Sequence, residues 1–205
     1  MDTEITIVYI RHAPKLYKND KHFNKSHHPH DSPIKFEHII DITNKSNKLI
    51  ENFGNPTVCL CSPYKRTRQT LDYLISEINE NIPKIVDPTI CEYLGNVKQQ
   101  YLDLTPKVDE ETLKYDISPI GETKQNFIKR LNNHIRILGL KNLNINKNIL
   151  NYSKDNKLTI WVITHGYVIS NIYEILTNIK IDRPKELTGF YVKGKIGKIE
   201  DINFI

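Results

Sequence analysis

The chain has 205 residues, of which 39% are hydrophobic and 26% are charged, so it can bury one substantial core and is typical of globular proteins. Its net charge of +5 comes from lysines scattered along the sequence, a pattern that does not favour nucleic-acid binding. No apolar run reaches the roughly 18–20 residues of a membrane span, and the acidic start of the chain does not resemble a signal peptide.

The three cysteines are Cys59, Cys61 and Cys91, an odd number that lacks the spacing of a zinc site. Cys59 and Cys61 alternate with apolar residues, so we expect buried free thiols in a reducing compartment, and we place the protein in the cytoplasm. The length predicts a single domain over residues 1–205.

The first half of the chain alternates between buried strands and amphipathic helices. A continuously apolar strand is expected over 4–10 and a second over 57–61. Helices are expected over 38–53, where Gly54 is placed to end the helix, and over 65–79. A long polar loop, residues 14–36, separates the first strand from the first helix.

The second half continues this alternation. A short strand is expected at 84–86, a loop at 96–120, a helix over 121–138, a surface connection with room for a short helix over 141–157, and a third core strand at 158–164. The following helix runs to about residue 179, and the alternating tail predicts one or two antiparallel strands. The sequence therefore predicts a three-layer α/β/α sandwich with a mainly parallel central sheet.

Polar side chains follow three of the expected strands at the point where each strand ends. Arg11 and His12 follow the first strand, Ser62 and Arg66 follow the second, and His165 follows the third core strand. The carboxyl ends of parallel strands meet at one edge of a sheet, so we expect these side chains to converge. Arginines donate paired hydrogen bonds to phosphate oxygens, so such a cluster predicts a site for a phosphate dianion.

Five motifs resemble, in chain order, those of the histidine phosphatase superfamily, which is also called phosphoglycerate mutase-like. They are Arg11-His12-Ala13, Ser62-Pro63 with Arg66, Gln69 and Thr70, Glu92 with Gly95, Gly121-Glu122-Thr123, and Thr164-His165-Gly166. The resemblance covers most of the chain, and it implies the phosphoglycerate mutase-like fold.

The resemblance also implies a two-step phosphoryl transfer. His12 would attack phosphorus to form a phosphohistidine, which water would then hydrolyse. Glu92 would protonate the leaving oxygen, and His165 would complete the catalytic set. The substrate phosphate would be bound by Arg11, Arg66, His165 and Lys15. The implied enzyme is a phosphoric monoester hydrolase of the histidine acid phosphatase type, which needs no metal or other cofactor.

Residues 13–20 depart from the family pattern. Ala13 replaces glycine, Pro14 stands where many members have glutamate, and the tryptophan and asparagine of mutases are missing. These departures favour hydrolysis over mutase chemistry. A phosphoglycerate-type mutase and a catalytically silent module that binds phosphate or a phosphopeptide remain the alternatives, and Glu92 has the alternative of being a solvated loop carboxylate.

The loops at 14–36 and 96–120 are the expected inserts that decide specificity. The first contains His22, His27, His28 and His30, but it lacks cysteines, so we favour an exposed loop over a metal site. The expected partner is a small phosphorylated substrate or a phosphopeptide, with no membrane or nucleic-acid partner, and a homodimer is compatible with the sequence.

Overall fold

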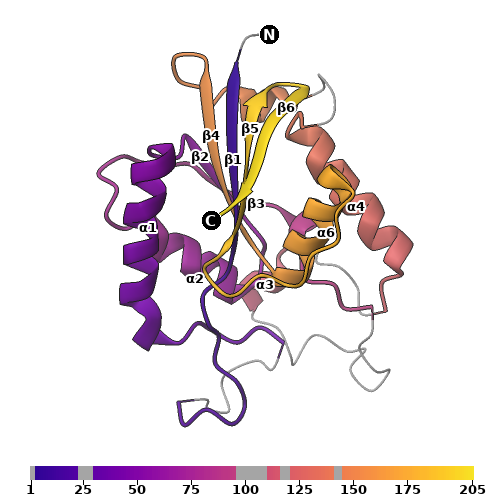
Figure 1. Cartoon of the computed structure of the whole chain (residues 1–205). Helices are drawn as coiled ribbons and strands as arrows, with labels where there is room; N and C mark the ends of the chain where they lie inside the picture. Colours follow the sequence, from indigo (N-terminus) through magenta and orange to yellow (C-terminus); the bar gives the residue numbers. More distant parts are fainter. Residues whose placement is uncertain (1–2, 23–29, 96–109, 116–120, 141–144) are drawn as a thin grey trace.

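The computed structural model describes residues 3–22, 30–95, 110–115, 121–140 and 145–205. Across these ranges the backbone forms one sheet of six strands in the order β3-β2-β4-β1-β5-β6 (Figure 1). The strands are β1 (Glu4–Arg11), β2 (Val58–Cys61), β3 (Lys84–Val86), β4 (Lys157–Thr164), β5 (Gly189–Lys195) and β6 (Lys198–Phe204). Neighbours among the first four pair in parallel, whereas β5 and β6 add antiparallel pairs, so the expected mainly parallel sheet is confirmed.

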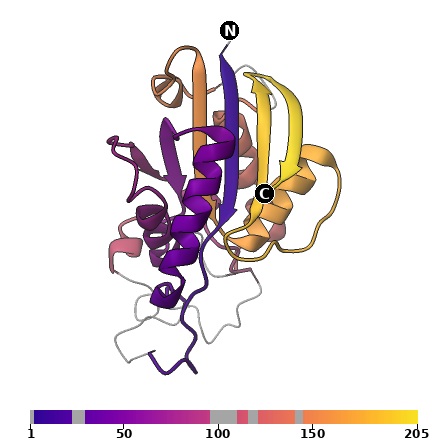
Figure 2. The ribbon, with the colours of Figure 1, turned by 60° about the vertical axis from the view of Figure 1, so that its left-hand side comes forward.

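Helices cover both faces of this sheet (Figure 2). They are α1 (Ile39–Phe53), α2 (Lys65–Leu74), α3 (Glu110–Leu113), α4 (Lys124–Ile137), α5 (Lys147–Leu150) and α6 (Gly166–Thr177), with short 3-10 turns η1 (Phe36–His38) and η2 (Pro88–Ile90). Apolar side chains of α1 and α2 pack on one face, and those of α4 and α6 pack on the other. The α/β/α layering predicted from the sequence is therefore confirmed.

The strand β1 is buried on both faces because its side chains alternate between the two cores. Ile5, Ile7 and Tyr9 belong to the core under α4 and α6, whereas Val8 and Ile10 belong to the core under α1 and α2. This double burial explains the continuous apolar run in the sequence. No helix within the described ranges combines the length and apolar character needed to cross a bilayer.

Several helix ends differ from the prediction. The helix expected over 65–79 ends at Leu74, whose carbonyl accepts a hydrogen bond from Ser46 of α1. The helix expected from residue 121 begins at Lys124, because the Thr123 side chain accepts a hydrogen bond from the Asn126 amide at 3.1 Å and so caps it. The final helix ends at Thr177 rather than at residue 179. Part of the predicted surface connection forms the short helix α5.

Gly189 of β5 lies directly against the backbone of β1. A Cβ atom at this position would lie 2.0 Å from the Tyr9 carbonyl oxygen, so the strands could not keep their spacing. We expect Gly189→Ala to lower the free energy of unfolding by about 1–3 kcal/mol or more, as overpacking does elsewhere. Urea denaturation would measure this, with Lys195→Ala at the exposed end of the same strand as the control. A change within experimental error of the control would contradict the prediction.

Candidate active site

The expected polar clusters converge beyond the carboxyl ends of β1, β2 and β4. The ends are level because Arg11 pairs with Thr164 and Cys61 pairs with Ile163 in the parallel ladders. Two further backbone hydrogen bonds extend this alignment past the strands, from the His12 amide to the Thr164 carbonyl at 2.9 Å and from the Ser62 amide to the Ile163 carbonyl at 3.0 Å. Parallel pairing thus brings three remote segments to one place.

His12 is buried and held in one tautomer. Its Nδ1 atom lies 2.8 Å from the Ala13 carbonyl oxygen, which can only accept, so Nδ1 carries the proton. The Nε2 atom therefore carries a lone pair, which accepts a hydrogen bond from Arg66 Nε at 3.3 Å. Burial, and then the Arg66 guanidinium, lower the pKa of His12 well below its ordinary value. An unprotonated ring with a lone pair beside a cation is what a nucleophile for phosphorus requires.

Arg66 lies at the centre of the cluster and is fully buried. Its Nη2 atom donates to Glu92 Oε2 at 2.5 Å and lies 3.2 Å from His165 Nδ1, and its Nη1 donates to the His30 carbonyl at 3.1 Å. The guanidinium also lies 4.6 Å from the centre of the Tyr64 ring. This one side chain therefore links three of the predicted site residues.

His165 is held in the opposite tautomer to His12. Its Nδ1 atom accepts from Arg66, because arginine can only donate, so its Nε2 donates to Ser62 Oγ at 2.8 Å. Burial lowers the pKa of His165, and the cation of Arg66 lowers it further. The two imidazole rings lie 5.4 Å apart, centre to centre. His165 also precedes α6, whose first amide groups are free to donate to an anion.

The lowered pKa of His12 gives a prediction about pH. A group whose pKa is lowered takes up its proton at a more acidic pH than usual, so His12 should stay neutral at pH 6.5, the ordinary histidine pKa. We expect nitrogen-15 NMR of the imidazoles to show an Nδ1-protonated neutral ring at this pH, with the signal assigned by its loss in His12→Ala. An imidazolium signal for His12 at pH 6.5 would contradict the assignment.

Glu92 and Lys15 lie at the rim of the cluster. The Glu92 side chain is 34% exposed and reaches inward to Arg66. Lys15 is half-buried, and burial, with the nearby Arg66 charge, lowers its pKa. Its ammonium group lies 5.5 Å from the centre of the Tyr17 ring. The structure thus places Glu92 in contact with Arg66 and Lys15 nearby, and their roles toward a ligand stay predictions.

Arg11 is oriented differently from the other predicted phosphate ligands. Its Nη1 donates to the Pro184 carbonyl at 2.7 Å, and its Nη2 lies 2.5 Å from a Glu186 carboxylate oxygen. The Nε atom is buried and has no hydrogen-bond partner among the described residues. Arg11 packs closely on Gly166, where an added Cβ would lie 3.2 Å from Arg11 Cδ. The structure thus brings Arg11 to the site with two of its nitrogens already bonded elsewhere.

The remaining motif residues fasten the loop at 14–36 to this site. Thr70 Oγ1 accepts from the Ala13 amide at 3.0 Å, and Gln69 Oε1 accepts from the Ile34 amide at 3.0 Å. Asp31 is buried and accepts from the Lys65 amide at 2.6 Å, at the start of α2. The described ends of this loop therefore belong to the wall of the site.

Sequence reasoning missed three residues near the site. Tyr64 packs its ring on Arg66, Glu186 pairs with Arg11, and Arg130 of α4 pairs with Glu122. The third had a partial signal, because Glu122 belongs to the Gly121-Glu122-Thr123 motif at the start of the predicted helix that carries Arg130. The other two had none, since each contact depends on how the chain is folded.

The histidines of the 14–36 loop do not form a metal centre in the part of the chain that is described. Within these ranges, no group of three or more histidine, cysteine or acidic side chains could hold an ion. His27 and His28 lie outside the described residues, as does most of the loop at 96–120. Cys59 and Cys61 are buried and form no disulfide, as expected, and Cys91 is buried as well.

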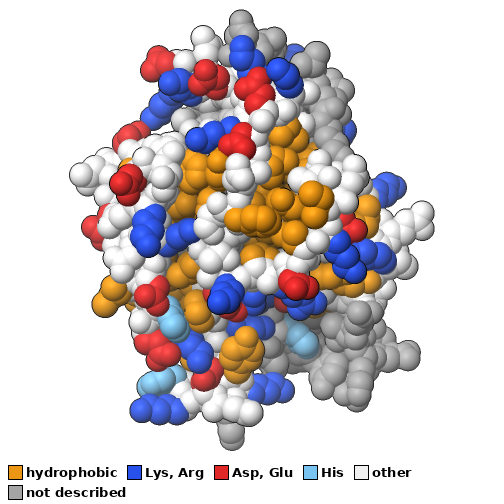
Figure 3. Space-filling model, viewed as in Figure 1, with side chains coloured by type: hydrophobic (Ala, Val, Ile, Leu, Met, Phe, Trp, Pro, Cys, Tyr) orange, Lys and Arg blue, Asp and Glu red, His pale blue; other side chains and the backbone are white. Residues whose placement is uncertain are grey.

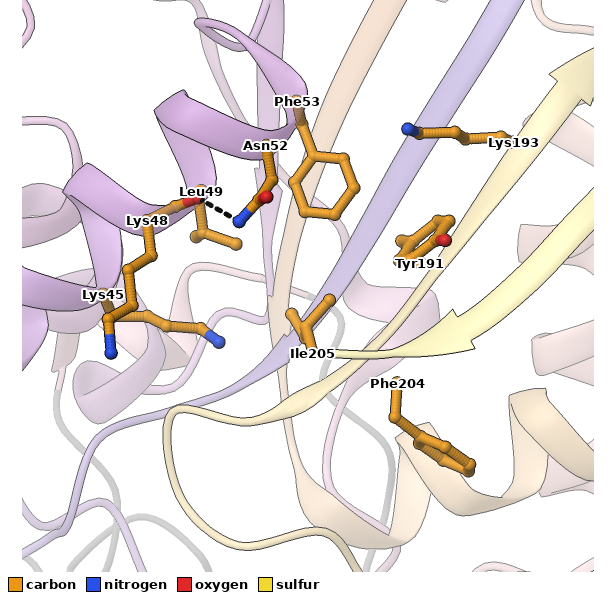
Figure 4. A pocket seen from close by; sticks show the side chains of 9 residues that line it. All are labelled: Lys45, Lys48, Leu49, Asn52, Phe53, Tyr191, Lys193, Phe204 and Ile205. Atoms are coloured by element: carbon orange, nitrogen blue, oxygen red, sulfur yellow. Dashed lines mark hydrogen bonds between the residues drawn. The ribbon is translucent and has the colours of Figure 1, made fainter.

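A second hollow lies apart from these residues, between α1 and β5 (Figure 4). Its volume is about 330 Å³, and Phe53, Tyr191 and Ile205 lie between the lysines of α1 and Lys193. Apolar side chains gather at the centre of the same face (Figure 3). The hollow contains neither an imidazole nor an acidic side chain, so the groups that phosphoryl transfer requires are at the strand ends instead.

Comparison with known proteins agrees with this geometry. A family model described as the histidine phosphatase superfamily (branch 1) matches residues 8–193, which include all six predicted site residues. No curated protein sequence gave a significant match.

Solved structures of similar fold include both mutases and phosphatases. A phosphoglycerate mutase from Bacillus anthracis str. Sterne has a TM-score of 0.66 and 17% identity, with 97% of this chain and 92% of that chain covered. A putative alpha-ribazole-5'-P phosphatase from Escherichia coli str. K-12 substr. MG1655 has a TM-score of 0.59 and 16% identity, with 98% and 96% covered. The protein histidine phosphatase SixA, solved with tungstate, has a TM-score of 0.54 and 13% identity, with 97% and 95% covered. At these identities the likeness shows the fold and leaves the substrate open.

Proposed function

This chain belongs to the histidine phosphatase superfamily, and from that membership we propose that it hydrolyses phosphate monoesters through a phosphohistidine on His12. The observation that carries the proposal is the placement of the His12 ring, whose Nδ1 is bonded to the Ala13 carbonyl and whose Nε2 accepts from Arg66 Nε at 3.3 Å. The proposed activity is that of a histidine acid phosphatase-type phosphoric monoester hydrolase, acting on a small phosphorylated substrate or a phosphopeptide.

In the first step, His12 Nε2 attacks phosphorus, and the bond to the leaving oxygen breaks as the nitrogen–phosphorus bond forms. Arg66 and His165 donate hydrogen bonds to the equatorial oxygens, on which negative charge is spread. For His165 this requires the ring to be protonated or to turn its Nε2 proton from Ser62 to the substrate. Arg66 Nη2 turns from Glu92 to the phosphate, and the Glu92 carboxylate, released from this pair, takes up a proton. The protonated Glu92 then transfers this proton to the leaving oxygen, so the product leaves as an alcohol.

In the second step, water attacks the phosphohistidine from the side that the leaving group has vacated. Glu92, now ionised, accepts a proton from this water, so its carboxyl group is protonated again. The nitrogen–phosphorus bond breaks, inorganic phosphate is released, and the lone pair returns to His12 Nε2. Arg11 Nε and Lys15 are further cations that we place around the phosphate in both steps.

The experiment that tests this proposal measures free phosphate. We expect the purified protein to release phosphate from para-nitrophenyl phosphate and from at least one phosphorylated metabolite or phosphotyrosine peptide. Transfer between two positions of a phosphoglycerate without phosphate release would instead indicate the mutase. Saturable binding of a phosphorylated ligand without turnover would indicate the silent module.

A further inference from the structure

The segment that carries Glu92, residues 87–95, is held by hydrogen bonds from side chains that are not among the predicted site residues. It begins at Asp87, whose carboxylate accepts from the Thr89 amide at 2.8 Å and caps the turn η2. Thr164 of β4 then donates its hydroxyl to the Ile90 carbonyl at 2.7 Å. The strand β4, which leads to His165, thus also holds the residues that precede Glu92.

The helix α4 holds the same segment at two places. At the beginning of the Glu92 segment, His134 Nδ1 of α4 donates to Asp87 Oδ2 at 2.7 Å. Nearer the site, Arg130 Nη1 donates to the Thr89 carbonyl at 2.7 Å, and Arg130 Nη2 lies 3.5 Å from the Glu92 carbonyl. Arg130 is therefore the side chain of α4 that reaches the backbone of Glu92 itself.

Arg130 is in turn locked by Glu122. The guanidinium donates to both carboxylate oxygens, through Nε at 2.8 Å and through Nη2 at 3.0 Å. The side chains of Arg130 and Glu122 are only 15% and 5% exposed, and the guanidinium stacks 4.7 Å from the centre of the Phe127 ring. A paired arginine with this geometry has little freedom to move.

Glu122 also touches the other side of the Glu92 segment. A Cβ at Gly95 would lie 2.4 Å from the Glu122 carbonyl oxygen, and the Gly121 amide donates to the Leu94 carbonyl at 3.1 Å. The two segments therefore fit together closely, and Glu122 and Arg130 support Glu92 from both ends.

We propose that Arg130, locked by Glu122, is the positioning residue that aims the Glu92 carboxyl at the leaving oxygen. The inference rests on the proposed function, in which Glu92 is the general acid. Arg130 reaches the backbone of the Glu92 segment and pairs with Glu122, whereas Arg66 donates to the Glu92 carboxylate and to both imidazoles, so the two arginines hold Glu92 at different points. Proton transfer requires the two oxygens to come within about 2.6–3.2 Å, so a small displacement of this segment would impair the transfer.

The test compares two leaving groups. Nitrophenolate departs without a proton, whereas an alkoxide such as that of glycerol 2-phosphate requires one, so loss of the general acid affects the alkyl ester far more. The ratio of kcat/KM for glycerol 2-phosphate to that for para-nitrophenyl phosphate therefore measures how well the acid is aligned. Partial unfolding, or a weaker hold on phosphate, would lower both values together and leave the ratio unchanged.

The variants are Glu92→Gln as the reference, Arg130→Ala, Arg130→Lys, Glu122→Gln and, as matched control, Arg136→Ala on the exposed side of the same helix. We expect Glu92→Gln to lower the ratio most. Arg130→Ala should lower it about tenfold, with part restored in Arg130→Lys, because an ammonium group replaces some of the hydrogen bonds of the guanidinium. Arg136→Ala should match the wild type.

If Arg130→Ala does not fold, the ratio is measured in Glu122→Gln instead, because this substitution removes the charge that locks Arg130 and preserves the shape of the side chain.

The failures are distinguishable. A ratio that falls in Glu92→Gln but not in the folded Arg130 or Glu122 variants would overturn the positioning role and leave the proposed function standing. A ratio unchanged in Glu92→Gln itself would overturn the general acid, and with it this inference. A wild-type protein that releases no phosphate from either ester would overturn the proposed function as well.

Discussion

Replacement of His12 by alanine is expected to abolish phosphatase turnover. In the proposed reaction this side chain supplies the attacking Nε2 lone pair, whereas the Nε2 of His165, the other imidazole of the described cluster, carries a proton that it donates to Ser62. Loss of a nucleophile typically costs a factor on the order of 10⁴ or more in kcat. The measurement is phosphate release from para-nitrophenyl phosphate under saturating substrate.

Trapping of the phosphohistidine intermediate tests the same variant in a second way. A radiolabelled substrate, quenched rapidly into alkali in which phosphohistidine is stable, should label the wild type but not His12→Ala. His38→Ala, at a surface histidine beside α1, is the matched control and should retain both turnover and label. Turnover by His12→Ala close to that of this control would contradict the assigned nucleophile.

Conversion of Arg66 to lysine is expected to cost almost as much, although the charge is kept. The guanidinium donates at once to Glu92, to the His30 carbonyl and toward both imidazoles, whereas an ammonium group on a flexible stem cannot reach all of them. We expect kcat/KM to fall by about 10²–10³-fold, which is the typical effect of removing one preorganised donor.

The effect of Arg66→Lys should appear in both steps of the reaction, since the same oxygens are held in each. Arg136→Lys, the same substitution at an exposed position of α4, should leave kcat/KM unchanged and serves as control. If Arg66→Lys retained more than a tenth of the wild-type kcat/KM, charge alone would be sufficient at this position, and the paired geometry would not matter.

Much of the fold could be predicted because β1 and β4 are buried on both faces. Their apolar runs are long enough to be identified without any knowledge of neighbours, and the observed limits of these strands agree with the prediction to within a residue. The end of α2 could not be predicted in this way. It depends on Ser46 of α1, which satisfies the Leu74 carbonyl from another helix.

For the site, the sequence predicted which residue types come together, but it could not predict how their side chains are oriented. The predicted cluster of His12, Arg66, Glu92 and His165 forms around Arg66. Arg11 was expected to bind the phosphate, yet two of its nitrogens bond to Pro184 and Glu186. Those partners lie in a loop that has no signal of its own in the sequence.

The chemical groups at the strand ends follow from the amino-acid sequence alone, because parallel strands carry the residues that follow them to one edge of the sheet whatever the surroundings. The proton-bearing nitrogen of each histidine, and the support that Arg130 gives to the backbone of Glu92, follow instead from how the chain is folded. A hydrogen bond requires its atoms to be placed to within a few tenths of an ångström, and the partners here come from segments far apart in the chain.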